Sequence, residues 1–436
     1  MGIGTFVSQA ARPITPTQRR KRTSTGDLIL IAAVIALCIF GLLMLYSAST
    51  DFSYLNYGSQ TFMFNKQLIF LAGGILIAFA ASRVDYHLYR RFALPLMVVA
   101  IVLLIAVLLT KDMRNGAIRT LFGGSVQPSE LAKLAMILYL SVWLYSKQEY
   151  LHDIQLGLAP LAIILGGIAG LIYLEPDLSA TITIFLLGGL LFFLAGGELR
   201  QIILFCLVAL VAGWVVVQIS RTGRARMASY LAGLKDPLKS SSHVLWSLES
   251  VYRGKWFGVG IGNATTKLIG LPFSATDSIF AVIVEELGLF GALGLISLYG
   301  ILLWRGLVIA SKAPDLLGSI MAAGLTFWII IEALINMTMI IGLIPVAGNA
   351  LPFVSAGGSN LISTLTAIGI LLGISRQSGK KVPAESNERR LNSATVDLRR
   401  RDRRRSLSRP GRAASHQRKC RSALDRRRRR NGNQTR

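Results

Sequence analysis

The sequence predicts an all-α polytopic membrane protein of about ten transmembrane helices, with a long extracytoplasmic loop between helices 7 and 8. Of the 436 residues, 53% are hydrophobic and only 16% are charged, whereas soluble domains are about 25% charged. Apolar runs long enough to cross a hydrocarbon core of about 30 Å as helices recur along the chain. Lys and Arg, 47 in all against 22 Asp and Glu, gather at the two ends and in short connections.

The apolar runs indicate where each helix lies in chain order, because a helix needs roughly 17 to 25 residues to cross the membrane. Ten segments qualify, near residues 28–48, 67–82, 92–110, 129–146, 156–174, 178–195, 201–219, 278–304, 318–343 and 351–375. The first follows Arg19–Arg22 as in a signal peptide, but its apolar run is too long for a typical signal, so we expect an uncleaved helix.

Basic residues in short connections predict the orientation. The Arg19–Arg22 cluster, Arg83 with Arg90 and Arg91, and the C-terminal tail fall on one side if ten helices alternate. The positive-inside rule makes that side the cytoplasm. We therefore expect a multi-pass protein of the cytoplasmic membrane with both termini cytoplasmic, and the loop 220–277 on the opposite face.

Three regions follow from this division: a basic cytoplasmic segment 1–27, a membrane domain 28–375, and a cytoplasmic tail 376–436. The tail carries 22 Lys and Arg against 5 Asp and Glu, and almost no aromatic residues. Such a composition cannot bury enough apolar area to fold, so we predict disorder. Anionic lipids are the favoured partner, since each basic residue near the membrane surface contributes about 1 kcal/mol; nucleic acid is the less favoured one.

The sequence lacks the motifs typical of several classes of protein. There is no Walker-type G-x-x-x-x-G-K-[ST] sequence, which argues against an ATP-driven pump within this chain. Cys38, Cys206 and Cys420 provide no disulfide pair in a hydrophilic loop, and no His or Cys cluster has the spacing of metal ligands.

The polar segments that remain all fall on the predicted outer face, and a shared site is the economical explanation. They are Gln127 to Lys133, Glu175-Pro176-Asp177, Thr276-Asp277 and Leu351 to Ser359. Pro128 suits a first helical turn, with Glu130 beside the helix dipole and Lys133 one turn deeper. A capped helix with a local ion pair is an equally good interpretation.

Asp277 stands where the long loop meets an apolar helix, a suitable place for a general base. On the residues alone, a helix N-cap is the favoured alternative. Glu285 and Glu286 lie roughly 12 Å further along a helix. At 100° per residue Glu286 points opposite Asp277 and Glu285 is about 80° away, so at most Glu285 shares its side. We interpret Glu286 and Glu332 as structurally paired acids.

Pro352, Ser355, Gly357 and Gly358 can break the start of the last helix and let the backbone approach a ligand closely, although a re-entrant turn would look the same. The basic residues of the long loop, Lys267 among them, have the charge to neutralise a diphosphate.

In this order the motifs resemble those of the SEDS (shape, elongation, division, sporulation) peptidoglycan glycosyltransferases, the FtsW and RodA family. The similarity runs from about Ile29 to Ser375. Its pieces are Leu45-Tyr46-Ser47-Ala48-Ser49, Lys66-Gln67, Asn115-Gly116-Ala117-Ile118-Arg119, Gln127 to Lys133, Pro176-Asp177, Gly258-Val259-Gly260-Ile261-Gly262-Asn263, Leu271-Pro272 with Thr276-Asp277, Glu285-Glu286-Leu287-Gly288, and Leu351 to Ser359.

The resemblance implies polymerisation of lipid II into nascent glycan strands at the outer leaflet of the bacterial cytoplasmic membrane, during division or elongation. It implies inversion at the donor's anomeric carbon, with Asp277 as the base that takes the proton of the acceptor sugar 4-hydroxyl. A class B penicillin-binding protein (transpeptidase) is the implied partner, and a divalent cation, Mg or Mn, is the one candidate cofactor. The implied substrate-binding residues are Arg119, Gln127, Glu130, Lys133, Asp177, Lys267, Glu285, Pro352, Ser355, Gly357 and Gly358.

Some positions depart from the family pattern while Asp277 remains. They are Thr120 for Trp, Ala275 for His, Ser278 for Phe, Ala356 for Tyr, and His243 and Trp246 where Gln is common. The first-helix ending and the long basic ends are slightly closer to FtsW than to RodA. Two alternatives stay open: a lipid II flippase, since intramembrane Glu and Lys also mark transport paths, and a non-catalytic scaffold for division or elongation.

Overall fold

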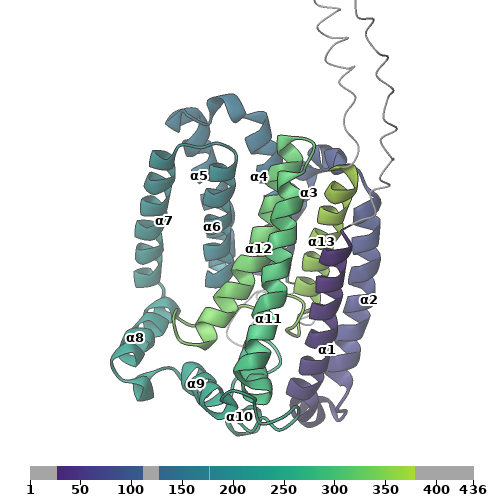
Figure 1. The fold of residues 1–436 in the computed structure, drawn as a ribbon. Helices are drawn as coiled ribbons and strands as arrows, with labels where there is room; N and C mark the ends of the chain where they lie inside the picture. Colours follow the sequence, from purple (N-terminus) through teal and green to yellow (C-terminus); the bar gives the residue numbers. More distant parts are fainter. Residues whose placement is uncertain (1–26, 111–126, 176, 379–436) are drawn as a thin grey trace, which may run out of the picture. The chain divides into compact units, whose positions relative to one another are not determined.

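The structure is a computed structural model that describes residues 27–110, 127–175 and 177–378, and within them it is helical with no strand. The predicted all-α class is therefore confirmed for this part of the chain (Figure 1). Ten helices match the ten apolar segments: α1 Leu28–Tyr57, α2 Phe62–Arg83, α3 Tyr89–Thr110, α4 Pro128–Ser146, α5 Ala159–Leu174, α6 Leu178–Leu194, α7 Leu199–Ile219, α11 Ile279–Ser311, α12 Leu316–Ile340 and α13 Gly358–Ser378.

Eight helical stretches among the described residues are long and apolar enough to cross a membrane, which makes this a multi-pass membrane protein. Two of the ten fall outside that set. The apolar helix α6 has only 17 residues, and α4 carries the charged pair Glu130 and Lys133 in its first turns. The exact number of spans stays a prediction. Residues 1–26 of the predicted N-terminal segment and residues 379–436 of the predicted tail lie outside the described residues.

Several helix boundaries differ from the sequence-based expectation by five to nine residues, among them the end of α1 and the start of α13. Helix α1 continues past residue 48 to Tyr57 and ends where Gly58 adopts a left-handed conformation (φ 69°). Helix α13 begins at Gly358 rather than near 351, because the chain before it forms a turn. Ser355 Oγ accepts from the Leu351 amide at 2.7 Å, and Phe353 has φ 66°.

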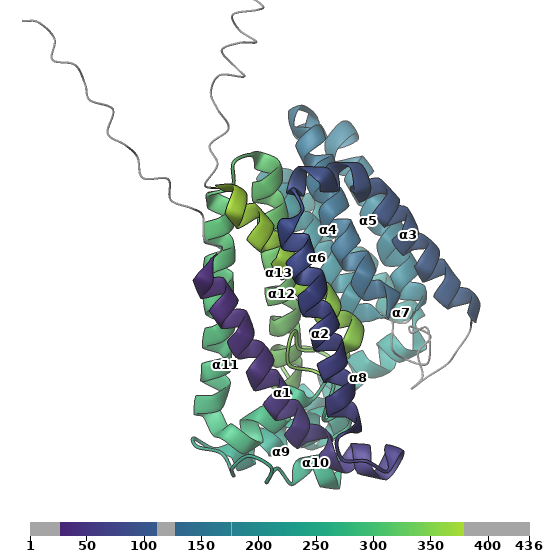
Figure 2. The same ribbon diagram turned by 90° about the vertical axis from the view of Figure 1, so that its right-hand side faces the viewer.

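The long loop between α7 and α11 contains three helices, α8 Arg221–Lys235, α9 Ser242–Gly254 and α10 Thr266–Ile269. They lie at the end of the bundle away from the start of α1 and the end of α13 (Figures 1 and 2). We call this the loop end. At the opposite end Arg305 pairs with Asp27 at 2.5 Å and Arg376 donates to the Ser82 carbonyl at 2.9 Å. Which end faces the cytoplasm stays a prediction.

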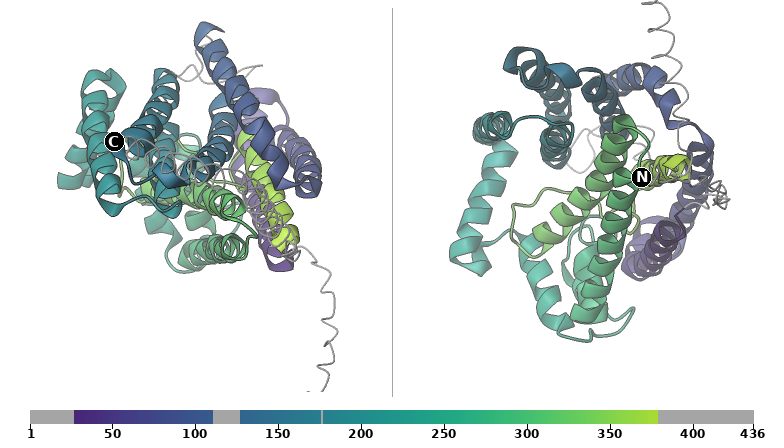
Figure 3. Two further views of the ribbon diagram at one scale, coloured as in Figure 1. Left: turned by 90° about the horizontal axis from the view of Figure 1, so that it is seen from above. Right: turned by 45° about the horizontal axis from the view of Figure 1, so that its top comes forward.

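Helix α12 forms the centre of the packing. It contacts α4, α6, α11 and α13, and in a view along the bundle it lies between α11 and the α4–α6 helices (Figure 3). In its most apolar window 72% of residues are buried, against 6% for α7. Polar side chains on α12 are therefore far from solvent and must find partners on neighbouring helices.

Helix α11 is broken at Gly288, whose φ of 68° and ψ of −165° are not helical. The freed backbone groups pair with the loop that follows α9. Leu289 N donates to Lys255 O at 3.0 Å, and Val259 N donates to Glu285 O at 2.9 Å. A side chain at position 288 would overlap the backbone of Trp256 and Gly258. Glycine is needed here, and the break fixes the loop against the first turns of α11.

Candidate functional site

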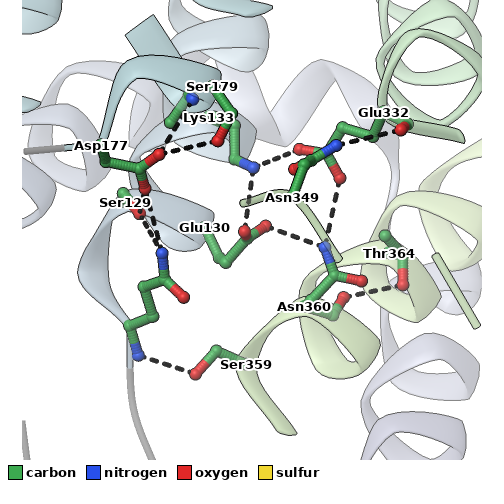
Figure 4. Close-up of polar contacts among 12 residues, drawn as sticks. Ser129, Glu130, Lys133, Asp177, Ser179, Glu332, Asn349, Ser359, Asn360 and Thr364 are labelled. Atoms are coloured by element: carbon green, nitrogen blue, oxygen red, sulfur yellow. Dashed lines mark hydrogen bonds and ion pairs between the residues drawn. The ribbon is translucent and has the colours of Figure 1, made fainter. Parts of the chain in front are cut away.

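A buried charge cluster lies between α4, α12 and α13, and we call it the Lys133 cluster. Lys133 Nζ is 2.9 Å from Glu130 Oε1 and forms a second ion pair with Glu332. Asn360 Nδ2 donates to both carboxylates at 3.1 Å (Figure 4). Trp328 Nε1 donates to Glu332 at 2.7 Å. Lys133 is 1% exposed and Glu332 0%, so these charges are kept in the bundle by one another.

A second set of polar groups joins the starts of α4, α6 and α13. Asp177 caps α6 by accepting from Ala180 N at 3.1 Å. Its other oxygen accepts from Gln127 Nε2 at 3.1 Å and Ser129 Oγ at 3.2 Å. Gln127 N donates to Ser359 Oγ at 2.8 Å (Figure 4). The structure thus brings together three of the four polar segments expected to share a site, and the fourth bonds to the residues just before α13. Their contact with substrate stays a prediction.

The fourth segment, residues 271–278, carries Asp277, and we call it the Asp277 loop. Asn336 of α12 donates to the Asp277 carbonyl at 2.8 Å. Ser355 Oγ donates to the Thr276 carbonyl at 2.6 Å, and Ala356 N donates to the Ala275 carbonyl at 2.9 Å. Three consecutive backbone carbonyls are therefore held by other parts of the chain, while the Asp277 residue is half-buried.

The alternative of an N-cap role for Asp277 is wrong by position. Helix α11 begins at Ile279, so Ser278 occupies the N-cap and its side chain makes no capping bond. Asp277 stands one residue before it, in the irregular loop.

Helix α12 links the Asp277 loop to the Lys133 cluster. Asn336 Nδ2 donates also to the Asn349 carbonyl at 2.5 Å. Asn349 Nδ2 donates in turn to the backbone carbonyl of Glu332 at 2.9 Å. Glu332 and Asn336 are one helical turn apart, so the same stretch of α12 binds the buried ion pair and fixes the backbone at Asp277.

The side chains of Lys267 and Glu285 both have partners within the fold. Lys267 Nζ pairs with Glu286 at 2.9 Å, and Ser47 Oγ donates to Glu286 at 2.6 Å. Glu285 accepts from Thr265 N at 2.9 Å and from the Thr266 hydroxyl. That Glu285 shares the side of Asp277 stays a prediction, and the loop after α9 docks beside it, with Val259 N donating to the Glu285 carbonyl.

The other predicted residues are placed as follows. Pro352 O accepts from Tyr299 at 2.5 Å. Gly357 N donates to Gln67 Oε1 at 3.3 Å. A Cβ at Gly358 would lie 2.6 Å from the Phe70 ring. With Ser355 they lie in the turn before α13 and at its first residue, and both the ligand-binding and the re-entrant interpretation stay predictions. Arg119 lies outside the described residues.

Several buried amides escaped the sequence interpretation, namely Gln67, Asn336, Asn349 and Asn360. Each is at most 5% exposed and each bonds across the fold. For Gln67, Asn336 and Asn360 a signal was present, because a lone Asn or Gln within an apolar helical run needs a specific partner in the membrane; Asn349 lies between α12 and α13. The partners themselves depend on helix packing.

Two titratable groups at the loop end have strongly shifted pKa values. Burial, and then the neighbouring Asp177, raise the pKa of Glu175 to about 8, and neither of its carboxylate oxygens has a hydrogen-bond partner in the part of the chain that the structure describes. Burial, and then Arg226, lower the pKa of His243 to about 4. Near neutral pH most Glu175 is protonated and His243 is neutral.

The described residues contain no group of three or more His, Cys, Asp or Glu side chains that could hold a metal ion. The arrangement provides a carboxylate on a loop whose backbone accepts three hydrogen bonds, one from α12 and two from the turn before α13. Such preorganisation suits proton transfer from a bound hydroxyl.

Comparison with known proteins gives consistent matches. Residues 27–380 match the family model FTSW_RODA_SPOVE, described as cell cycle protein. Stage V sporulation protein E of Bacillus subtilis (strain 168) is 38% identical over 363 residues, 82% of this chain and 99% of that protein. The probable peptidoglycan glycosyltransferase FtsW of Trichlorobacter lovleyi is 36% identical over 358 residues, covering 81% and 94%.

Solved structures agree on the fold. A chain from a study of how a peptidoglycan synthase complex coordinates polymerization and crosslinking has a TM-score of 0.68 at 27% identity, covering 82% of this chain and 99% of that one. The rod shape determining protein RodA of Thermus thermophilus has a TM-score of 0.60 at 24% identity, covering 81% and 97%, which supports the fold alone.

Proposed function

This chain belongs to the FtsW, RodA and SpoVE family of cell cycle proteins, and from that premise we propose that it polymerises lipid II with Asp277 as the general base. Its relatives make it a peptidoglycan glycosyltransferase of cell-wall synthesis. The proposal adds the substrate, the outer face of the bacterial cytoplasmic membrane and the roles of individual residues.

The observation that carries the proposal is the anchoring of the Asp277 loop. Its carbonyls at Ala275, Thr276 and Asp277 accept hydrogen bonds from the loop before α13 and from Asn336. General bases need a fixed position relative to the hydroxyl they deprotonate, and a misplacement of about 1 Å can lower a rate about 100-fold. Anchoring the backbone while the residue stays half-buried supports that role.

In the proposed step, the acceptor sugar 4-hydroxyl oxygen forms a bond to the anomeric carbon of the donor. Asp277 takes the hydroxyl proton, and the bond from the anomeric carbon to the diphosphate oxygen breaks, so that the lipid diphosphate leaves with the electron pair. A single displacement inverts the anomeric configuration. On the long loop between α7 and α11, Lys267 is the candidate for countering the diphosphate charge.

Partners follow from the same premise. Crosslinking of glycan strands is transpeptidase chemistry, and the similarity to a chain of a synthase complex named for polymerization and crosslinking supports a penicillin-binding protein partner. We propose a class B enzyme. The predicted basic tail would contact anionic lipids at the inner surface.

The transporter alternative draws on the intramembrane charges, but each member of the Lys133 cluster has partners within the fold, which favours a structural role. The full chain, reconstituted with its cognate class B penicillin-binding protein and lipid II, should form glycan visible on gels, and Asp277→Ala should stop it. Ser297→Ala is the matched control, because Ser297 is exposed and donates only to its own helix.

Two outcomes would contradict the proposal. Transfer of lipid II between leaflets that survives Asp277→Ala, with no glycan from the parent, would make the chain a transporter. Full complementation of growth by Asp277→Asn would make it a scaffold.

A further inference from the structure

Ser278, the residue after Asp277, is tied to the loop helix α9 by a side-chain hydrogen bond. Ser278 Oγ lies 2.8 Å from His243 Nε2 and 2.6 Å from the Pro272 carbonyl oxygen. Ser278 is 0% exposed and His243 9%. This contact joins α9 and the two ends of the Asp277 loop at a single buried hydroxyl.

The direction of both hydrogen bonds follows from counting protons. A carbonyl oxygen can only accept, so the one hydroxyl proton of Ser278 goes to Pro272. His243 must then donate from Nε2, which leaves Nδ1 without a proton. Nδ1 has no hydrogen-bond partner among the described residues. The opposite tautomer would bury an unsatisfied N–H, at about 1–3 kcal/mol.

The surroundings keep this imidazole in one state. Burial and the nearby Arg226 both disfavour the imidazolium form, so His243 is a fixed neutral donor rather than a proton carrier at neutral pH. Its hydrogen bond complements those of Asn336 and Ser355, which hold the carbonyls of residues 277 and 276. Together they constrain the peptides on both sides of the Asp277 side chain.

We propose that His243 is a positioning residue for Asp277, acting through the Ser278 hydroxyl as an Nε2–H donor. This rests on the proposed function of Asp277, and it adds a residue of the long loop to those that position the base. Movement of α9 is then transmitted directly to the peptide beside the carboxylate. The hydrogen bond between His243 and Ser278 determines where the base lies, and neither residue contacts substrate.

The test measures kcat and KM for lipid II with the full chain and its penicillin-binding protein partner. We expect His243→Leu and Ser278→Ala each to lower kcat about tenfold with little change in KM. His243→Gln should retain most of kcat, because its Nε2 amide lies the same number of bonds from Cβ and donates one N–H to Ser278. The double variant His243→Leu/Ser278→Ala should be no slower than the worse single variant, since both remove one interaction.

Ser247→Ala is the matched control, because Ser247 is buried on the same helix and its hydroxyl donates to the His243 backbone carbonyl. It should keep parental kcat. The inference is overturned if His243→Gln is as slow as His243→Leu, if the two single effects multiply in the double variant, or if only thermal stability changes. Ser278→Ala and His243→Gln provide the answer if His243→Leu does not fold.

Asp277→Asn, measured in the same series, separates this inference from the proposed function. If Asp277→Asn polymerises at the parental rate, the general-base proposal fails. If Asp277→Asn is inactive while His243→Leu and Ser278→Ala keep parental kcat, only the positioning role of His243 fails.

Discussion

The Lys133 cluster and the Asp277 loop use polar groups in opposite ways. In the cluster, the charged side chains themselves are the partners, with Lys133 bound to Glu130 and Glu332. In the loop, neighbouring side chains and amides bind backbone carbonyls, and Asp277 is held through its main chain. A charge in an apolar run therefore does not by itself mark chemistry.

The largest effect on stability is expected from Lys133→Met. This change leaves Glu130 and Glu332 buried without a counter-charge, and breaking a buried pair on one side destabilises a protein by about 3–5 kcal/mol. Thermal unfolding in detergent measures it. Adding Glu130→Gln and Glu332→Gln should recover most of the loss, because no uncompensated charge remains.

Ser141→Ala is the control for that series, since Ser141 is buried on the same helix and donates to the Ile137 carbonyl of its own helix. If Lys133→Met unfolds at the same temperature as Ser141→Ala, the cluster does not hold the bundle together, and the contrast with the Asp277 loop disappears.

A smaller loss of stability but a clear loss of rate is expected from Asn336→Leu. It leaves the carbonyls of Asp277 and Asn349 without a donor, which should destabilise the fold by about 1–3 kcal/mol. Because the Asp277 backbone is then free to shift, kcat for lipid II polymerisation should fall by about 10- to 100-fold.

Thr338→Ala is the control on the same helix, because the Thr338 hydroxyl bonds only to α12 carbonyls. A normal kcat in Asn336→Leu would show that the Asn336 hydrogen bond does not position the base, and the loop would then resemble the cluster in being structural.

A pH dependence of stability is expected from His243. The folded state takes up the imidazole proton near pH 4 and the unfolded state near 6.5. Protons therefore bind the unfolded state preferentially, and stability should decline as pH falls from about 6.5 to about 4. His243→Gln should remove this component. If the melting temperatures of the parent and of His243→Gln change in parallel over that pH range, the claim that His243 is buried as a neutral imidazole is refuted.

Part of this arrangement could be predicted from the sequence. Helix alternation placed Gln127, Asp177 and the turn before α13 at one end, and the hydrogen bonds among them bear this out. The pairing of Lys133 with Glu332, 199 residues away, could not be predicted, since it depends on how α4 packs against α12. Glu332 was correctly interpreted as a paired acid, but without its partner.

Two further features needed the three-dimensional structure. The docking of the loop after α9 beside Glu285 could not be predicted, because the backbone leaves the helical conformation at Gly288 and helical periodicity does not extend to a loop docked against such a break. His243 and Ser278 had each been noted as departures from the family pattern. Their contact at 2.8 Å relates them, although 35 residues separate them along the chain.

The most direct test of the account is the single-turnover rate of glycan formation by Asp277→Asn with saturating lipid II, measured together with its melting temperature. Asn keeps the size of Asp but accepts no proton, so we expect the rate to fall by about 100- to 10,000-fold while the melting temperature stays at the parental value. Glycan formed at the parental rate by this variant would contradict the assignment of Asp277 as the base.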